Sequence, residues 1–96
     1  MTMPYLLVRQ KVTDYEQWKS AFEAHGLTRQ VNGSRGGQLF RNASDPNEVI
    51  MLLEWDVMEN ARQFAQSEEW RALMQGAGVI DHPIICFLKD GEQVSR

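Results

Sequence analysis

The polar and apolar residues of this chain change period several times, and each change predicts a secondary-structure element. The run from Tyr5 to Val12 is rich in β-forming residues and predicts a first strand. Gly26 predicts the end of the helix that follows, and the three glycines between Leu27 and Gly37 predict a loop. The helix itself is predicted by residues that recur at steps of three and four, the spacing of one helical face: Tyr15, Trp18, Phe22 and His25.

Capping motifs mark where the predicted helices begin. In the segment TDYE, the Thr13 side chain can accept from the backbone N–H of Glu16, whose own side chain can reach back. The segment DVME repeats this box-like spacing with Asp56 and Glu59. Ser67 is followed by two acids, the pattern of a fresh N-cap, so we expect the second helix to break there and restart.

Three more strands complete the pattern. They are expected over Gln38–Asn42, Glu48–Trp55 and Pro83–Lys89, and Ser44–Asn47 is expected to form the turn between the first two. The order β-α-β-β-α-β with right-handed crossovers predicts an α+β fold of the ferredoxin-like, split βαβ type. Its four-stranded antiparallel sheet would have the order 4-1-3-2, with both helices on one face. Neither a linker nor a composition change divides residues 1–96, which predicts a single domain.

The third predicted strand, EVIMLLEW, raises a question about what covers the sheet. A strand with one wet face alternates apolar and polar residues, but Val49 to Leu53 are all apolar. The two helices can cover only one face, and no segment of the chain is long and apolar enough to cover the other. A second copy of the same sheet would cover it, so we expect a homodimer through the sheet face.

Composition excludes several classes of partner. The net charge of -3 at pH 7 provides no basic field, so we expect no nucleic-acid partner and no membrane attachment. One cysteine, Cys86, and two histidines are too few for a disulfide or for a metal site of soft ligands, so no metal is expected. The first ten residues lack the features of a signal peptide, which predicts a cytoplasmic protein.

Three segments carry a resemblance to a known group of proteins. They are YLLVRQKVTDYEQWKSAFEAH, QLFRNASDPNEVIMLLEWD, and a broken helix ending in AGV with a last strand ending in FLKD. Together they resemble the dimeric α+β barrel superfamily, and within it the small proteins similar to antibiotic biosynthesis monooxygenases, which are described as cyclases or monooxygenases. The resemblance implies that two sheets pair to form the barrel. It also implies a substrate cavity between the helices and the sheet of each subunit.

The candidate catalytic residues lie near the end of that helix–sheet layer where the first helix stops: His25, Arg29 and Glu54. His25 continues the apolar stripe of its helix, where an imidazole could act as a general base. It could instead interact with the carbonyl groups at the helix C-terminus. Glu54 needs a partner for its charge, either Arg29 or Arg41, in a structural ion pair or as a proton acceptor.

Aromatic side chains could supply a flat apolar pocket for a small hydrophobic or aromatic ligand. The same helical spacing is also typical of an ordinary hydrophobic core, so both interpretations stay open. The residues concerned are Trp18, Phe22, Trp55, Phe64 and Trp70.

The sequence lacks a phosphate loop, a dinucleotide-binding fingerprint and a Ser-His-Asp signature. In the haem-degrading members of the superfamily, the second helix carries the haem ligand. The corresponding residues 59–75 contain no histidine, so we expect no cofactor. The leading hypothesis is a cofactor-independent monooxygenase that acts on an electron-rich aromatic or polyketide-like substrate. The alternatives are an isomerase or cyclase on the same scaffold, and a non-enzymatic dimeric module that binds a small ligand.

Overall fold

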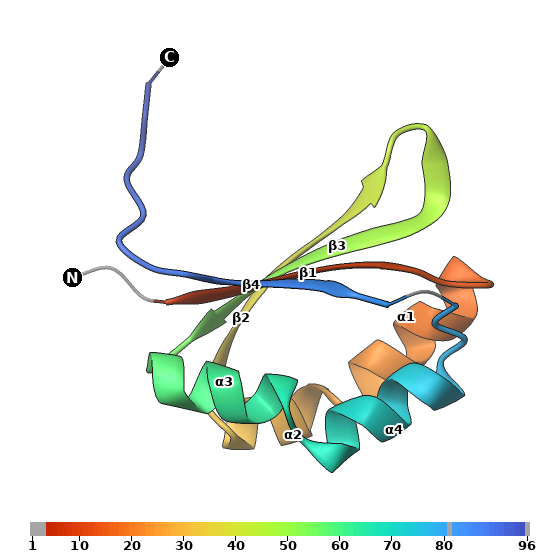
Figure 1. Ribbon diagram of the computed structural model, residues 1–96, viewed down its shortest axis with the longest axis horizontal. Helices are drawn as coiled ribbons and strands as arrows, with labels where there is room; N and C mark the ends of the chain where they lie inside the picture. The colour runs from red at the N-terminus through yellow and green to blue at the C-terminus, as the bar shows by residue number, and fades with distance from the viewer. Residues whose placement is uncertain (1–3, 81, 96) are drawn as a thin grey trace.

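A four-stranded antiparallel sheet carries a layer of helices on one of its faces (Figure 1). The computed structural model describes residues 4–80 and 82–95. The sheet order is β2-β3-β1-β4, which is the order predicted from the sequence. The elements are β1 (Tyr5–Lys11), α1 (Tyr15–Ala24), α2 (Gly26–Val31), β2 (Ser34–Asn42), β3 (Asp45–Trp55), α3 (Met58–Ala65), α4 (Glu68–Gly76) and β4 (Ile84–Leu88).

The apolar run in β3 divides into two faces because successive side chains of a strand point in opposite directions. One set is fully or almost fully buried against the helices: Val49, Met51, Leu53 and Trp55. Ile50 and Leu52 point to the other face of the sheet, where they are only half-buried. Their partners across the β1–β3 ladder are Arg9 and Leu7.

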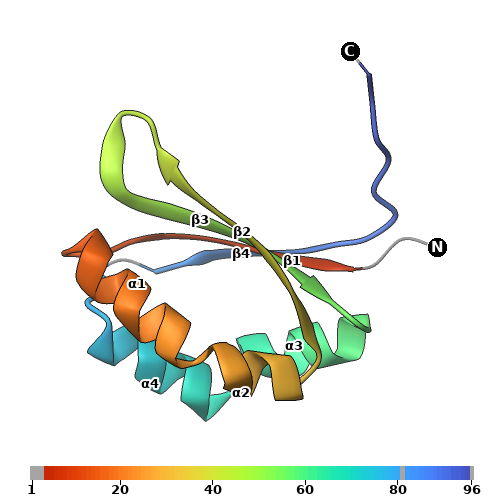
Figure 2. The same ribbon diagram turned by 180° about the vertical axis from the view of Figure 1, so that it is seen from behind.

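The second face of the sheet carries no helix, as the two opposite views show (Figures 1 and 2). Apolar side chains from all four strands lie on this face, together with the ion pair of Arg9 and Glu48. Phe40, Ile84 and Leu88 expose 49%, 53% and 38% of their surface and flank the half-buried Leu7 and Leu52. We call this surface, formed by Leu7, Phe40, Ile50, Leu52, Ile84 and Leu88, the open face. It is the face through which the sequence predicts a homodimer, and that assembly stays a prediction.

The predicted cap of the first helix is wrong by one residue. Asp14 is the N-cap of α1, and its Oδ1 accepts from the backbone N–H groups of Glu16 at 2.9 Å and Gln17 at 3.4 Å. The backbone N–H of Thr13 instead donates to the carbonyl of Gly78 at 2.9 Å. This bond continues the strand pairing past Lys11, and the helix therefore begins one position later.

The loop predicted between Leu27 and Gly37 is also wrong. Residues Gly26–Val31 form α2, which continues from α1 almost without interruption, and β2 begins as early as Ser34. A side chain at Gly37 would collide with the backbone carbonyl oxygen of Leu52. The glycine there permits close pairing of two strands rather than a flexible loop.

The second half of the chain agrees with the predicted helix break but not with the predicted cap. Ser67 is the N-cap of α4 and accepts from the backbone N–H of Trp70 at 3.1 Å, as expected. The N-cap of α3 is Val57, without a side-chain cap bond. The Asp56 carboxylate binds the N–H of Val57 at 2.6 Å and the amide of Asn60 at 3.0 Å instead.

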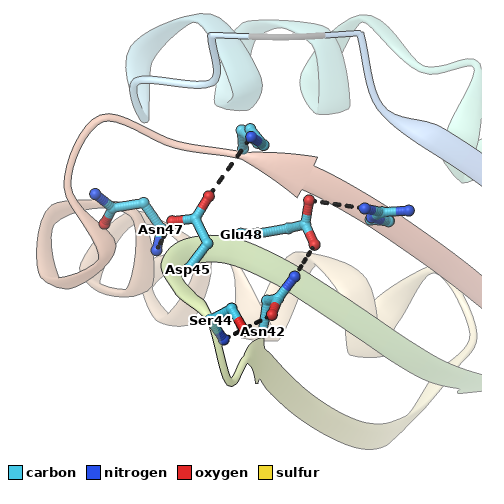
Figure 3. A network of polar contacts seen from close by, with 7 residues as sticks. Asn42, Ser44, Asp45, Asn47 and Glu48 are labelled. Atoms are coloured by element: carbon cyan, nitrogen blue, oxygen red, sulfur yellow. Dashed lines mark hydrogen bonds and ion pairs between the residues drawn. The ribbon is translucent and has the colours of Figure 1, made fainter.

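A polar network closes the β2–β3 hairpin (Figure 3). The turn is formed by Ala43 and Ser44, and β3 begins at Asp45, so the turn predicted over Ser44–Asn47 lies too far along the chain. The buried Glu48 carboxylate accepts from Asn42 Nδ2 at 2.7 Å, which ties the two strands together next to the turn.

Within the described part of the chain, none of the helices is long and apolar enough to cross a membrane.

Candidate functional site

A cavity of about 760 Å³ opens between the α1–α2 segment and the β2–β3 half of the sheet. It lies at the end of the helix–sheet layer where α1 stops, the region that the sequence favoured for a site. One wall comes from the helices, one from the glycine-rich strand β2, and the floor from β3. The lining residues are Phe22, Gly26, Arg29, Gln30, Val31, Gly33, Ser34, Arg35, Gly36, Gly37, Gln38, Leu39, Leu53 and Asp56.

The aromatic wall of the cavity is held in place from behind. Phe22 is 8% exposed, and its ring stacks on Trp18 with centroids 5.1 Å apart and planes 16° apart. Trp18 in turn lies 6.1 Å from the Tyr15 ring. Three aromatic residues on successive turns of α1 therefore fix the orientation of Phe22, the aromatic residue of the cavity lining.

Arg29 is the buried cation of the cavity. Its guanidinium carbon lies over the Phe22 ring, 3.6 Å from the ring centroid, and its Nη1 donates to the Phe22 carbonyl at 2.7 Å. The residue is only 8% exposed. Burial lowers the pKa of the Arg29 guanidinium, although an arginine side chain stays protonated in proteins.

Two more charged residues line the cavity. The hydrogen bonds from Asn60 and the Val57 N–H hold the pKa of Asp56 below its ordinary value, with a smaller contribution from the charge of Arg35. A carboxylate whose charged form is stabilised in this way is a poor proton acceptor. Asp56 therefore fixes the strand-to-helix junction rather than acting as a base.

The other predicted aromatic residues form a separate cluster in the hydrophobic core. The Phe64 ring lies 5.1 Å from Trp55 and 5.1 Å from Trp70. None of these three residues lines the cavity described above, although Phe64 borders a smaller hollow of about 270 Å³ between α3 and α4. The prediction that all five aromatic residues bind ligand stays untested, and the geometry brings only Phe22 to the larger cavity.

His25 and Glu54 do not line the cavity either. His25 is exposed at the junction of α1 and α2, where its backbone N–H donates to the Phe22 carbonyl at 3.3 Å, and it immediately precedes the lining residue Gly26. Glu54 lies between the buried Leu53 and Trp55, so its side chain points to the opposite face of the sheet.

The ion pair predicted for Glu54 does not form within the described residues. Arg29 lies on the helix side of the sheet, and no carboxylate of residues 4–80 and 82–95 forms an ion pair with it. Arg41 stacks over the Tyr15 ring at 3.9 Å and donates through Nε to the Pro46 carbonyl at 2.9 Å. The prediction failed because the even-numbered positions of β3 face away from the helices.

Most of the cavity lining was missed by the sequence analysis. The residues from Ser34 to Leu39 were assigned partly to a loop, yet they form the edge strand that walls the cavity. A usable signal was the pair Gly36 and Gly37, because adjacent glycines in a strand often mark a bulge or a close backbone approach. The register shift between Ser34 and Gly36 is such a bulge.

Among the described residues, no group of three or more His, Cys, Asp and Glu side chains could hold a metal ion.

A family model described as antibiotic biosynthesis monooxygenase matches residues 13–76, about two thirds of the chain. The match extends from the cap of α1 to the end of α4 and thus includes every residue that lines the cavity. A comparison with curated protein sequences finds no match.

Solved structures resemble the fold along almost the whole chain. SnoaB from Streptomyces nogalater, a cofactor-independent oxygenase, is 12% identical with a TM-score of 0.75, covering 99% of this chain and 100% of its own. A candidate antibiotic biosynthesis monooxygenase from Bordetella bronchiseptica is 14% identical with a TM-score of 0.77, covering 96% and 100%. Another from Caulobacter crescentus is 17% identical with a TM-score of 0.73, covering 94% and 91%. At these identities the likeness shows the fold alone.

Proposed function

This chain belongs to the antibiotic biosynthesis monooxygenase family, and from that premise we propose that it is a cofactor-independent monooxygenase of an electron-rich aromatic or polyketide-like substrate. The substrate would bind in the cavity beside Phe22 and Arg29. SnoaB, a cofactor-independent oxygenase of similar fold, supports the reaction type.

The cavity is the observation that carries this proposal. Its volume of about 760 Å³ falls within the range of about 300–1,000 Å³ that small-molecule sites occupy. The Phe22 ring is stacked on Trp18 and carries the Arg29 guanidinium over it, so it holds this cation in place at the cavity. Leu39 and Leu53 add apolar surface. The polar and charged side chains of the lining are those of Arg29, Gln30, Ser34, Arg35, Gln38 and Asp56.

The reaction needs a base and a dry pocket, and the substrate provides the electrons. An activated carbon or phenol loses a proton, and the resulting anion reduces O₂. One oxygen atom bonds to the substrate carbon, and the other leaves as water with the two displaced hydrogens, so that RH₂ + O₂ gives R=O + H₂O. The substrate supplies all the electrons that O₂ accepts. An apolar site that excludes water favours this chemistry because it protects the reactive anion from side reactions.

In this proposal His25 is the general base and acts from the rim of the cavity. It stands next to the lining residue Gly26, and its ring is exposed. An imidazole is suited to proton transfer near neutral pH. Arg29, Phe22 and Leu53 would position the substrate, whereas Glu54 on the opposite face would not contact it.

The working form in this proposal is a homodimer that pairs two open faces. The exposed apolar side chains of β2 and β4, Phe40, Ile84 and Leu88, support it because a contiguous exposed apolar patch usually marks an interface. Two sheets packed face to face would form the dimeric α+β barrel that the sequence resemblance implies.

An oxygen-uptake experiment tests the proposed reaction. Purified protein is mixed with anthrone and with dihydroxynaphthalenes in air-saturated buffer, and the product is analysed after a parallel reaction under ¹⁸O₂. We expect enzyme-dependent oxygen uptake and one labelled oxygen atom in the product. Turnover that continues without oxygen would favour the isomerase or cyclase alternative. Ligand-dependent thermal stabilisation without any turnover would favour the binding module.

A further inference from the structure

The geometry around Arg29 identifies the charge of the ligand. We infer that the cavity binds a planar aromatic anion, with a carboxylate or an ionised enol or phenol held in the plane of the Arg29 guanidinium. That this anion is the substrate rests on the proposed function. That the cavity binds such an anion can be tested without any turnover.

The hydrogen bonds of Arg29 leave most of its capacity unused. A guanidinium has five N–H donors, and the structure pairs one of them, from Nη1, with the Phe22 carbonyl. The other donors have no hydrogen-bond acceptor among the described residues. Arg29 also lines the cavity, so a ligand that enters the cavity meets the guanidinium that carries these donors.

The charge of Arg29 is equally uncompensated. Buried cations in proteins are normally paired with an acid, because removing an unpaired charge from water is costly. No carboxylate of the described chain forms an ion pair with Arg29, and the lowered pKa has desolvation as its only cause. The interaction with the Phe22 ring offsets part of this cost but supplies no negative charge.

The rest of the lining does not supply the missing charge. Two guanidinium groups, those of Arg29 and Arg35, stand against one carboxylate, that of Asp56. The oxygen atoms of that carboxylate already accept from Asn60 and from the Val57 N–H. The cavity is therefore cationic, whereas the chain as a whole carries a net charge of -3.

The position of the Phe22 ring selects the direction of approach and the shape of the ligand. The Arg29 guanidinium lies over the Phe22 ring, with 3.6 Å between the guanidinium carbon and the ring centroid. A partner with good hydrogen-bond geometry must then approach in the guanidinium plane, where the N–H groups point. Carboxylate and enolate oxygens meet such a fork well, and the aromatic body of the same ligand can lie against the apolar residues Leu39 and Leu53.

Matched ligands and matched variants test this inference without any reaction. Binding of 2-naphthoate and of its neutral counterpart 2-naphthamide is measured by calorimetry under nitrogen. We expect wild-type protein to bind the naphthoate about tenfold more tightly or better, the size of one charge-assisted hydrogen bond. Arg29→Met should abolish this preference, and Arg29→Lys should keep part of it. Arg35→Gln, at an exposed arginine of the same lining, should keep most of it.

The pH dependence of binding distinguishes a carboxylate ligand from an ionised phenol. Binding of 2-naphthoate should not change between pH 6 and pH 8, whereas 4-nitrophenol should bind more tightly as it ionises in that range. Circular dichroism and thermal unfolding establish that each variant is folded, and Arg29→Lys keeps the test valid if Arg29→Met does not fold.

Three results would overturn the inference: equal affinity of wild-type protein for the acid and the amide, a preference that survives in Arg29→Met, or no binding of either compound at millimolar concentration. Anion-selective binding without oxygen uptake would remove the proposed oxygenase and leave the anion site. Oxygen uptake with neutral substrates that does not depend on Arg29 would remove the anion site and leave the proposed oxygenase.

Discussion

Arg9 and Glu48 form an ion pair on the side of the sheet that carries no helix, with 2.9 Å between Nη2 and Oε2. The Glu48 side chain is 7% exposed and that of Arg9 is 50% exposed. Asn42 donates to the second carboxylate oxygen of Glu48, so the carboxylate is held from two strands (Figure 3). These contacts stabilise the charged form of Glu48.

This arrangement predicts how stability depends on pH. The hydrogen bonds from Arg9 and Asn42 lower the pKa of Glu48 from its ordinary value of 4.5. A group with a lowered folded-state pKa stabilises the fold above its unfolded-state pKa and loses that contribution as the pH falls through the folded-state value. The free energy of unfolding should therefore decrease below about pH 4.5, and Glu48→Gln should weaken this decrease.

Urea unfolding between pH 3 and pH 7 measures the effect. Glu92→Gln, in the exposed C-terminal tail, removes one carboxylate without touching the network and serves as the control. A pH dependence that is the same in Glu48→Gln and in the control would show that the pair contributes nothing.

The second prediction concerns the open face. Leu52 is half-buried there and lies opposite Leu7 in the β1–β3 ladder. If two open faces pair, Leu52→Asp places a charge without a partner in a dry interface and should dissociate the dimer or cause aggregation. Light scattering at micromolar concentration should give the mass of a dimer for the wild type. Val94→Asp, at a residue that is 81% exposed, should leave that mass unchanged. A monomeric wild-type protein would contradict the proposed assembly.

The third prediction separates cavity from core with two phenylalanines of equal exposure. Phe22 and Phe64 are both 8% exposed, but only Phe22 lines the large cavity. Replacing either by leucine should cost about 0.5–3 kcal/mol of unfolding free energy. Phe22→Leu should also weaken 2-naphthoate binding about two- to tenfold because the ring that holds the Arg29 guanidinium in place is lost. Calorimetry measures the affinities, and an equal loss of affinity in Phe64→Leu would place the ligand elsewhere.

The fold was predictable from the sequence because its signals are local and repeated. The helical spacing from Tyr15 to Phe22 and the N-cap at Ser67 both survive in the structure. The order of the four strands followed from the order of the elements and from the handedness of their crossovers. These features depend on the residues themselves and need no knowledge of which side chains meet.

The site was harder to predict because it depends on which face each residue occupies. Phe22 and Arg29 were identified as site residues and do line the cavity. Glu54 was expected nearby because it is close in the chain to that end of the sheet, but the alternation of β3 turns it away. The sequence predicts a loop for the wall formed by Gly36 and Gly37 because glycine favours turns. The close approach to β3 that requires Gly37 is a tertiary contact.

The last prediction concerns His25 and the proposed catalysis. The residue is exposed between α1 and α2, and no side-chain hydrogen bond or ion pair holds its ring within the described structure. His25→Ala should therefore change the free energy of unfolding by no more than about 0.5 kcal/mol, as is usual for a surface substitution. This outcome would exclude a structural role for the imidazole at the helix end.

If His25 is the base, the same substitution should lower kcat/KM for oxygen uptake by about 10²–10⁴-fold, the usual contribution of general-base catalysis. The rising limb of the pH–rate profile, which a base produces as it loses its proton, should disappear in the variant. Binding of 2-naphthoate should stay unchanged because Arg29 and Phe22 are intact. Gln30→Ala, at an exposed lining residue of α2 five positions further along the chain, controls for a general disturbance of α2. A variant that retains the wild-type rate and pH profile would show that the proton leaves by another route, such as spontaneous ionisation of a substrate beside the Arg29 cation.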